Sequence, residues 1–112
     1  MKNTETNWSK NEFKAYLFLY AAQADYIITD TEKDIIEELV DKRQYHKIFR
    51  ELENDNDIVS IKKIEYNLKK FNYSKNEKEQ LLVEINNLFL SDGNYNQLEK
   101  MLFHFFERIF KA

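Results

Sequence analysis

The scarcity of turn-forming residues limits the fold of this chain more than any other feature. Its 112 residues contain no proline and a single glycine, Gly93. Folds made of many short strands need many tight turns, and glycine and proline supply most of the backbone angles of such turns. A chain poor in both residues, yet 43% apolar, is therefore expected to be ordered and to consist of helices joined by short loops.

Helix start signals recur along the chain. A capping box, in which Ser or Thr is followed three residues later by Glu, marks the beginning of a helix. Three such pairs occur, namely Ser9/Glu12, Thr29/Glu32 and Ser74/Glu77. Apolar residues at helical spacing follow each pair, and in the fourth helix they predict that Ile58 faces the core and Lys63 the solvent. The predicted helices cover about residues 9–25, 30–41, 45–53, 57–71, 75–91 and 97–110.

Length and charge narrow the class of protein. A chain of this length is expected to form one domain, here residues 9–112, after a frayed N-terminus at residues 1–8. The net charge of −3 is mild and no cluster of basic residues stands out along the sequence, so nucleic acid is not an expected partner. No signal segment or run of about 20 apolar residues occurs, which predicts a cytoplasmic protein without membrane insertion.

Residues that carry catalytic chemistry are sparse. The chain has no cysteine and two histidines, His46 and His104. This excludes thiolate metal sites and cysteine nucleophiles, and no glycine-rich phosphate loop or nucleophile elbow is present. Paired carboxylates acting as acid and base would still need a nucleophile or a polarised pocket, and neither can be named. We therefore expect a protein that is not an enzyme.

An acidic motif occurs twice. Residues 25–32 (DYIITDTE) and 92–99 (DGNYNQLE) both begin with Asp, carry a capping residue at the fifth position and end with Glu. Each copy lies between two apolar helical runs, so a helical hairpin occurs twice with two further helices between the copies. Two such hairpins can pack about a pseudo-two-fold axis. The prediction is an all-α fold, a compact bundle of five to six helices built from two pseudo-symmetric helical hairpins.

These two motifs resemble the signature hairpins of the TerB-like family. The resemblance is carried by ADxxITxxE at residues 24–32 and DGxYNxxE at residues 92–99, and it covers about residues 12–110. The family takes its name from a bacterial tellurite-resistance protein. The resemblance implies an all-helical, non-enzymatic, cytoplasmic accessory domain of a stress-response system, with an acidic surface that binds a divalent metal. The first copy has Tyr26 where the family usually has Gly, so its turn is expected to have a different backbone.

The candidate metal ligands are Asp25, Glu32, Asp92 and Glu99. Their spacing matches the second half of an EF-hand loop, but the earlier ligand positions hold apolar or amide side chains in both copies, so neither is an EF-hand. A weaker site remains if the acids of both copies converge, and such oxygen ligands would suit Ca²⁺ or Mg²⁺. In the alternative interpretation the two glutamates cap their helices and the two aspartates shape the turns.

The last predicted helix is the candidate for binding a protein partner. Its apolar residues form two adjoining stripes, Leu98/Met101/Leu102/Phe105/Ile109 and Phe103/Phe106/Phe110. Such width indicates either a central helix packed on several neighbours or a helix that also meets a partner. Phe103, Phe106 and Phe110 are the predicted contact residues if they are exposed, and a homodimer is one form of this contact. Two functions thus stay open: a TerB-like domain that binds a divalent cation, and a protein-interaction or oligomerisation module.

Overall fold

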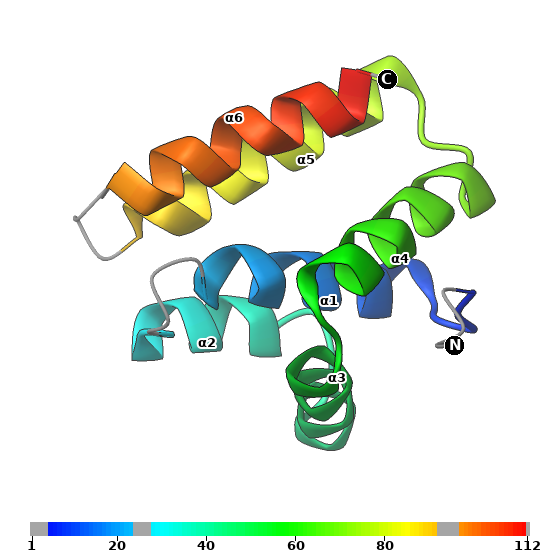
Figure 1. The fold of residues 1–112 in the computed structure, drawn as a ribbon. Helices are drawn as coiled ribbons and strands as arrows, with labels where there is room; N and C mark the ends of the chain where they lie inside the picture. Colours follow the sequence, from blue (N-terminus) through cyan, green and yellow to red (C-terminus); the bar gives the residue numbers. More distant parts are fainter. Residues whose placement is uncertain (1–4, 24–27, 92–96, 112) are drawn as a thin grey trace.

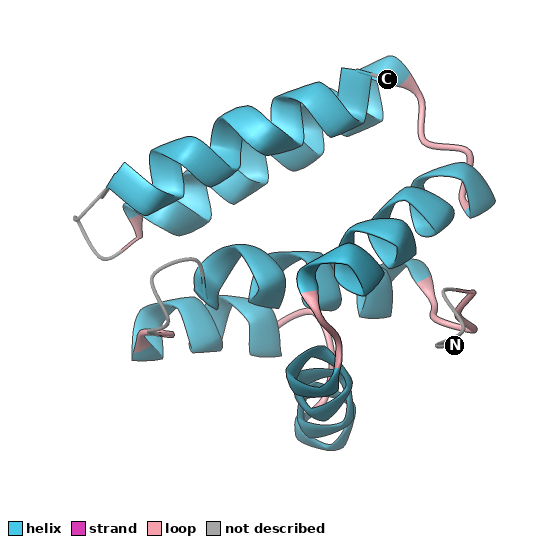
Figure 2. Cartoon of the chain, viewed as in Figure 1, coloured by secondary structure: helices cyan, strands magenta, loops and turns pink. Residues whose placement is uncertain are grey.

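The protein is an all-helical bundle. The computed structural model describes residues 5–23, 28–91 and 97–111, and within these ranges it contains helices and loops but no strands (Figures 1 and 2). The helices are α1 (Lys10–Ala22), α2 (Asp30–Glu37), α3 (Lys42–Asn54), α4 (Asp57–Lys70), α5 (Lys75–Leu90) and α6 (Gln97–Lys111). The predicted fold class, an all-α bundle of five to six helices, is confirmed for these residues.

The predicted capping boxes begin their helices. Ser9, Thr29 and Ser74 each accept a hydrogen bond from the backbone N–H three residues on, and the glutamate at that position accepts one from the backbone N–H of the cap. A fourth capping box, not predicted, is formed by Asp41 and Gln44 at the start of α3. The second helix therefore ends earlier and the third begins earlier than expected, because Asp41 caps α3 instead of lying within α2.

The central helix is α1, not the last helix. All residues from Ala15 to Ala22 are buried, and α1 packs on α2, α3, α4 and α5. This stretch contains no charged residue, and a helix that is apolar on every side must be covered on every side. The last helix packs mainly on α5 and also reaches α1, where the rings of Phe106 and Tyr20 lie 6.1 Å apart.

Two hairpins are visible in the arrangement of the helices. α5 and α6 lie antiparallel and side by side, and they cover one side of α1 (Figure 1). α2 packs on α1, while α3 packs on α1 and α2 and lies away from the α5–α6 hairpin (Figure 1). The hairpins share one core, in which Ile36 of α2, Phe89 of α5 and Phe106 of α6 are fully buried. This arrangement leaves the outer side of α6 available to solvent.

α4 turns the predicted residues Ile64 and Leu68 to the core, but two of its residues depart from the prediction. Ile58 is exposed, whereas Lys63 is buried. The Lys63 ammonium is paired there, since Nζ lies 2.7 Å from Oδ2 of the buried Asp55 side chain and 3.1 Å from Oε2 of the partly exposed Glu51. Burial alone would lower the pKa of Lys63, but the hydrogen bonds to Asp55 and Glu51 outweigh burial and raise it.

The Lys63 ion pair belongs to a polar cluster that joins α1, α3 and α4. The Tyr16 hydroxyl donates to Oδ2 of Asp55 at 2.8 Å and lies 2.9 Å from Oγ of Ser60. Burial is the main cause that raises the pKa of the Tyr16 phenol. In the described part of the chain no buried side-chain polar atom lacks a hydrogen-bond partner. The cluster is therefore satisfied internally, which indicates a structural role.

Candidate functional site

Two of the four candidate metal ligands lie in the part of the chain that the structure describes. Glu32 and Glu99 are each the third residue of their helix, α2 and α6, and they are only 2% and 3% exposed. Asp25 and Asp92 lie outside the described residues. The two glutamates thus hold equivalent positions, as the alignment of the two motifs predicts.

Glu32 acts as a helix cap. Its Oε1 accepts hydrogen bonds from the backbone nitrogen of Thr29 at 3.0 Å and from the Thr29 hydroxyl at 3.1 Å. The Thr29 hydroxyl oxygen in turn accepts from the backbone nitrogen of Glu32 at 3.1 Å. Over residues 5–23, 28–91 and 97–111, no group of three or more acidic, His or Cys side chains could hold a metal ion. The capping role of Glu32 is confirmed, and the cation site stays a prediction.

The candidate contact phenylalanines of the last helix lie mostly inside the bundle. Phe106 is 0% exposed, Phe110 is 3% exposed, and Phe103 is partly buried against the core. Phe106 packs on Phe110, with ring centroids 5.8 Å apart, and on Tyr20 of α1. The exposure on which that prediction depends is therefore absent at Phe106 and Phe110, which are core residues.

The other apolar stripe of α6 faces solvent at its N-terminal end. Leu98 is 48% exposed and Met101 is 60% exposed, although both are large apolar side chains. They lie in a groove of about 400 Å³ between α6, the end of α1 and the start of α4. The residues that line this groove, termed the α6 groove below, are Tyr20, Gln23, Asp57, Leu98, Met101, Leu102 and Phe105.

One wall of the α6 groove carries a carboxylate. Asp57 is an exposed residue in the first turn of α4, and its Oδ1 lies 3.4 Å from the Tyr20 hydroxyl. Burial raises the pKa of Tyr20 to about 12, and the charge of Asp57 adds to this shift. The Tyr20 hydroxyl thus stays protonated at neutral pH and donates to Asp57. The groove combines an apolar strip with one negative charge at its edge.

Equivalent exposed positions of the two hairpins carry different types of residue. When Glu32 is aligned with Glu99, Thr31 matches Leu98 and Asp34 matches Met101, and all four side chains are exposed. The first hairpin therefore exposes polar side chains to solvent at positions where the second exposes Leu and Met. The fold does not need apolar side chains at these positions. The sequence already contains a signal for this groove. Aligning the two motifs pairs Thr31 with Leu98 and Asp34 with Met101, so a polar residue of the first copy is replaced by an apolar one in the second at both positions.

Basic residues gather on one exposed face of α3. Arg43, His46, Lys47 and Arg50 line a shallow hollow of about 450 Å³. Spacings of three and four residues bring them to one side of the helix, although they do not form a run in the sequence. The prediction that basic residues are not clustered is therefore wrong for this face of α3. The expectation that nucleic acid is not a partner stays a prediction.

Comparisons with protein-family models, with curated proteins and with solved structures find no match to this chain. The resemblance to the TerB-like family therefore stays a prediction. None of the helices in the described part of the chain has the length and apolar character needed to cross a membrane.

Proposed function

We propose that this chain is a non-catalytic interaction domain whose α6 groove binds an amphipathic helix of a partner protein. The supporting observation is the exposure of Leu98 and Met101 at positions where the first hairpin has Thr31 and Asp34. An exposed apolar patch that the fold does not require is typical of a protein-binding site.

The spacing of the apolar residues favours a helical partner. Residues 98, 101, 102 and 105 follow one another along one side of α6, at steps of three, one and three residues. They span eight residues, that is seven steps or about 10 Å at a rise of about 1.5 Å per residue. A second helix with apolar residues at the same steps can pack along such a strip.

The charge at the groove favours a basic residue on that partner helix. Asp57 is exposed at the edge of the α6 groove, and the protein as a whole carries a net charge of −3. Opposite charges across an interface raise the association rate and fix the orientation of the partner. The proposed ligand is therefore a helix with apolar anchors on one side and Lys or Arg at the position that meets Asp57.

The resemblance to the TerB-like family supplies the biological setting of this proposal. An accessory domain of a bacterial stress-response system would act by contacting another protein rather than by catalysis. The equivalent burial of Glu32 and Glu99 supports the duplicated hairpin on which the resemblance depends.

The test is selection of helical peptides from a displayed library against the protein, followed by measurement of dissociation constants. In the Leu98→Thr/Met101→Asp variant, the second hairpin receives the residues of the first. Loss of two buried apolar contacts at about 1–2 kcal/mol each should weaken binding by at least about tenfold. The matched control, Val83→Asp/Leu90→Thr, changes two similarly exposed apolar residues of α5 and should bind like the wild type.

Two results would contradict the proposal. One is equal affinity of the selected peptides for the wild type, for Leu98→Thr/Met101→Asp and for the α5 control. The other is a set of selected peptides without apolar residues at helical spacing. Replacing Asp57 with Asn provides the finer test, because the selected basic residue should then lose most of its contribution to affinity.

A further inference from the structure

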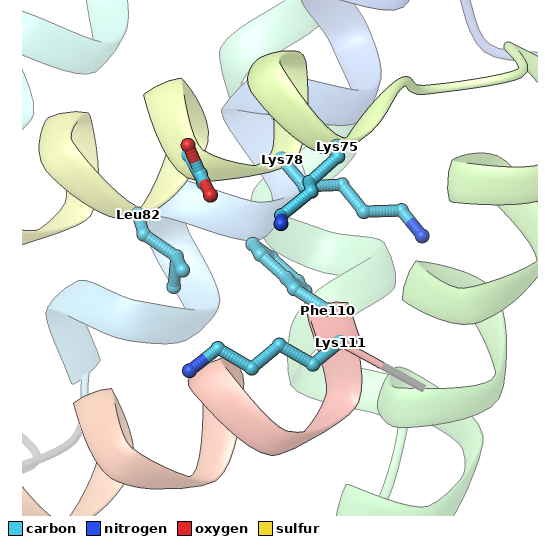
Figure 3. A pocket seen from close by; sticks show the side chains of 6 residues that line it. Lys75, Lys78, Leu82, Phe110 and Lys111 are labelled. Atoms are coloured by element: carbon cyan, nitrogen blue, oxygen red, sulfur yellow. The ribbon is translucent and has the colours of Figure 1, made fainter.

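A second site lies near the C-terminal end of α6 and is separate from the α6 groove. It is a cavity of about 490 Å³ between the start of α5 and the end of α6 (Figure 3). The residues that line it are Lys75, Lys78, Glu79, Leu82, Phe110 and Lys111. It shares no residue with the α6 groove, so the two sites can be tested independently.

The cavity is electropositive although the protein is acidic overall. Three lysines and one glutamate line it, while the chain carries a net charge of −3. In the part of the chain that the structure describes, none of the three lysines forms an ion pair. Three ammonium groups against one carboxylate leave the cavity with a net positive charge, which attracts an anion from solution.

The floor of the cavity is apolar. Phe110 is almost fully buried, and its ring lies at the centre of the site, with the lysines of α5 on one side and Lys111 on the other (Figure 3). Leu82, which is partly buried, extends this apolar surface along α5. Lysine side chains can lay their methylene stems on such a surface while their ammonium groups stay in water. The cavity therefore offers an apolar base with a cationic rim.

We propose that this cavity binds a small amphiphilic carboxylate, an anionic head group attached to an apolar chain. The head group would lie among the ammonium groups of Lys75, Lys78 and Lys111, and the apolar chain would cover Leu82 and Phe110. The volume lies within the range of about 300–1,000 Å³ that is usual for small-molecule sites. A singly charged head suits the site because Glu79 would oppose a higher negative charge and no arginine offers the planar fork that recognises phosphate.

The test is a titration of the ¹⁵N-labelled full chain with hexanoate, octanoate and decanoate below their micelle concentrations. Amide shifts should centre on Lys78, Leu82 and Lys111. Affinity should rise about threefold to fourfold for each methylene buried. The Lys78→Gln/Lys111→Gln variant should bind decanoate at least about tenfold more weakly, whereas decanol should bind the wild type more weakly than decanoate does.

A matched control removes the same charge elsewhere. Lys62→Gln/Lys69→Gln changes two exposed lysines of α4 and should leave decanoate affinity unchanged. An equal loss in both double variants would overturn the proposal, because it would show attraction to the overall charge only. Inorganic phosphate binding the same amides as tightly as decanoate would also overturn it, and so would decanoate shifts centred on Leu98 and Met101.

Discussion

The effect of replacing Lys63 with Met can be worked out from the structure. The Lys63 ammonium and the Asp55 carboxylate lie 2.7 Å apart, and their side chains are 7% and 3% exposed. Methionine is of similar size but removes the ammonium group that pairs with the Asp55 carboxylate. Removing one partner of a buried pair costs about 3–5 kcal/mol. Because the Tyr16 hydroxyl still donates to Asp55, we expect the lower end, about 3 kcal/mol.

Thermal and urea unfolding measure this loss. An unfolding entropy of about 2.1 cal/mol/K per residue gives about 0.24 kcal/mol/K for 112 residues, so the Lys63→Met variant should melt about 13 °C below the wild type. The double variant Asp55→Asn/Lys63→Met removes both charges and keeps an acceptor for Tyr16. It should recover to within about 1 kcal/mol of the wild type. A double variant as unstable as Lys63→Met would refute the reasoning, and so would a Lys63→Met variant as stable as the wild type.

Three further predictions concern stability. Phe106→Ala should lower the free energy of unfolding by about 3–5 kcal/mol in urea titrations, because the ring is fully buried, and a loss under 1 kcal/mol would contradict its place in the core. Thr29→Ala should cost about 1 kcal/mol by the same measurement, since it removes the cap of α2, and no change would contradict the capping role. The folded-state pKa of Tyr20, about 12, lies above its usual value of 10.0, so its contribution to stability is complete below pH 10 and is lost as the pH rises toward 12. Unfolding experiments between pH 9 and 12 should therefore show a smaller alkaline loss in Tyr20→Phe, and parallel curves would contradict the shift.

The starts of the helices could be predicted from the sequence because capping is local. Ser9, Thr29 and Ser74 each form hydrogen bonds with residues only three positions away. The capping box of Asp41 was not predicted because it combines Asp with Gln, whereas the pattern that predicts the other three pairs Ser or Thr with Glu.

The faces of α4 and α6 could be predicted only in part, because some of their residues are placed by contacts with other helices. In α4, Ile64 and Leu68 are buried as predicted, whereas Lys63 is buried because its ammonium group pairs with Asp55 and Glu51 near the end of α3. Both apolar stripes of α6 are evident in the sequence, but the positions of α1 and α5 decide that Phe106 lies inside and Met101 outside. The α6 groove likewise needs Tyr20 and Asp57, which lie far from α6 in the chain.

The dissociation constant of a selected helical peptide for the Leu98→Thr/Met101→Asp variant tests the central claim most directly. The variant changes exposed side chains only, so its free energy of unfolding should stay within about 0.5 kcal/mol of the wild type. With the fold intact, the account predicts binding at least about tenfold weaker than to the wild type. An unchanged dissociation constant would contradict it.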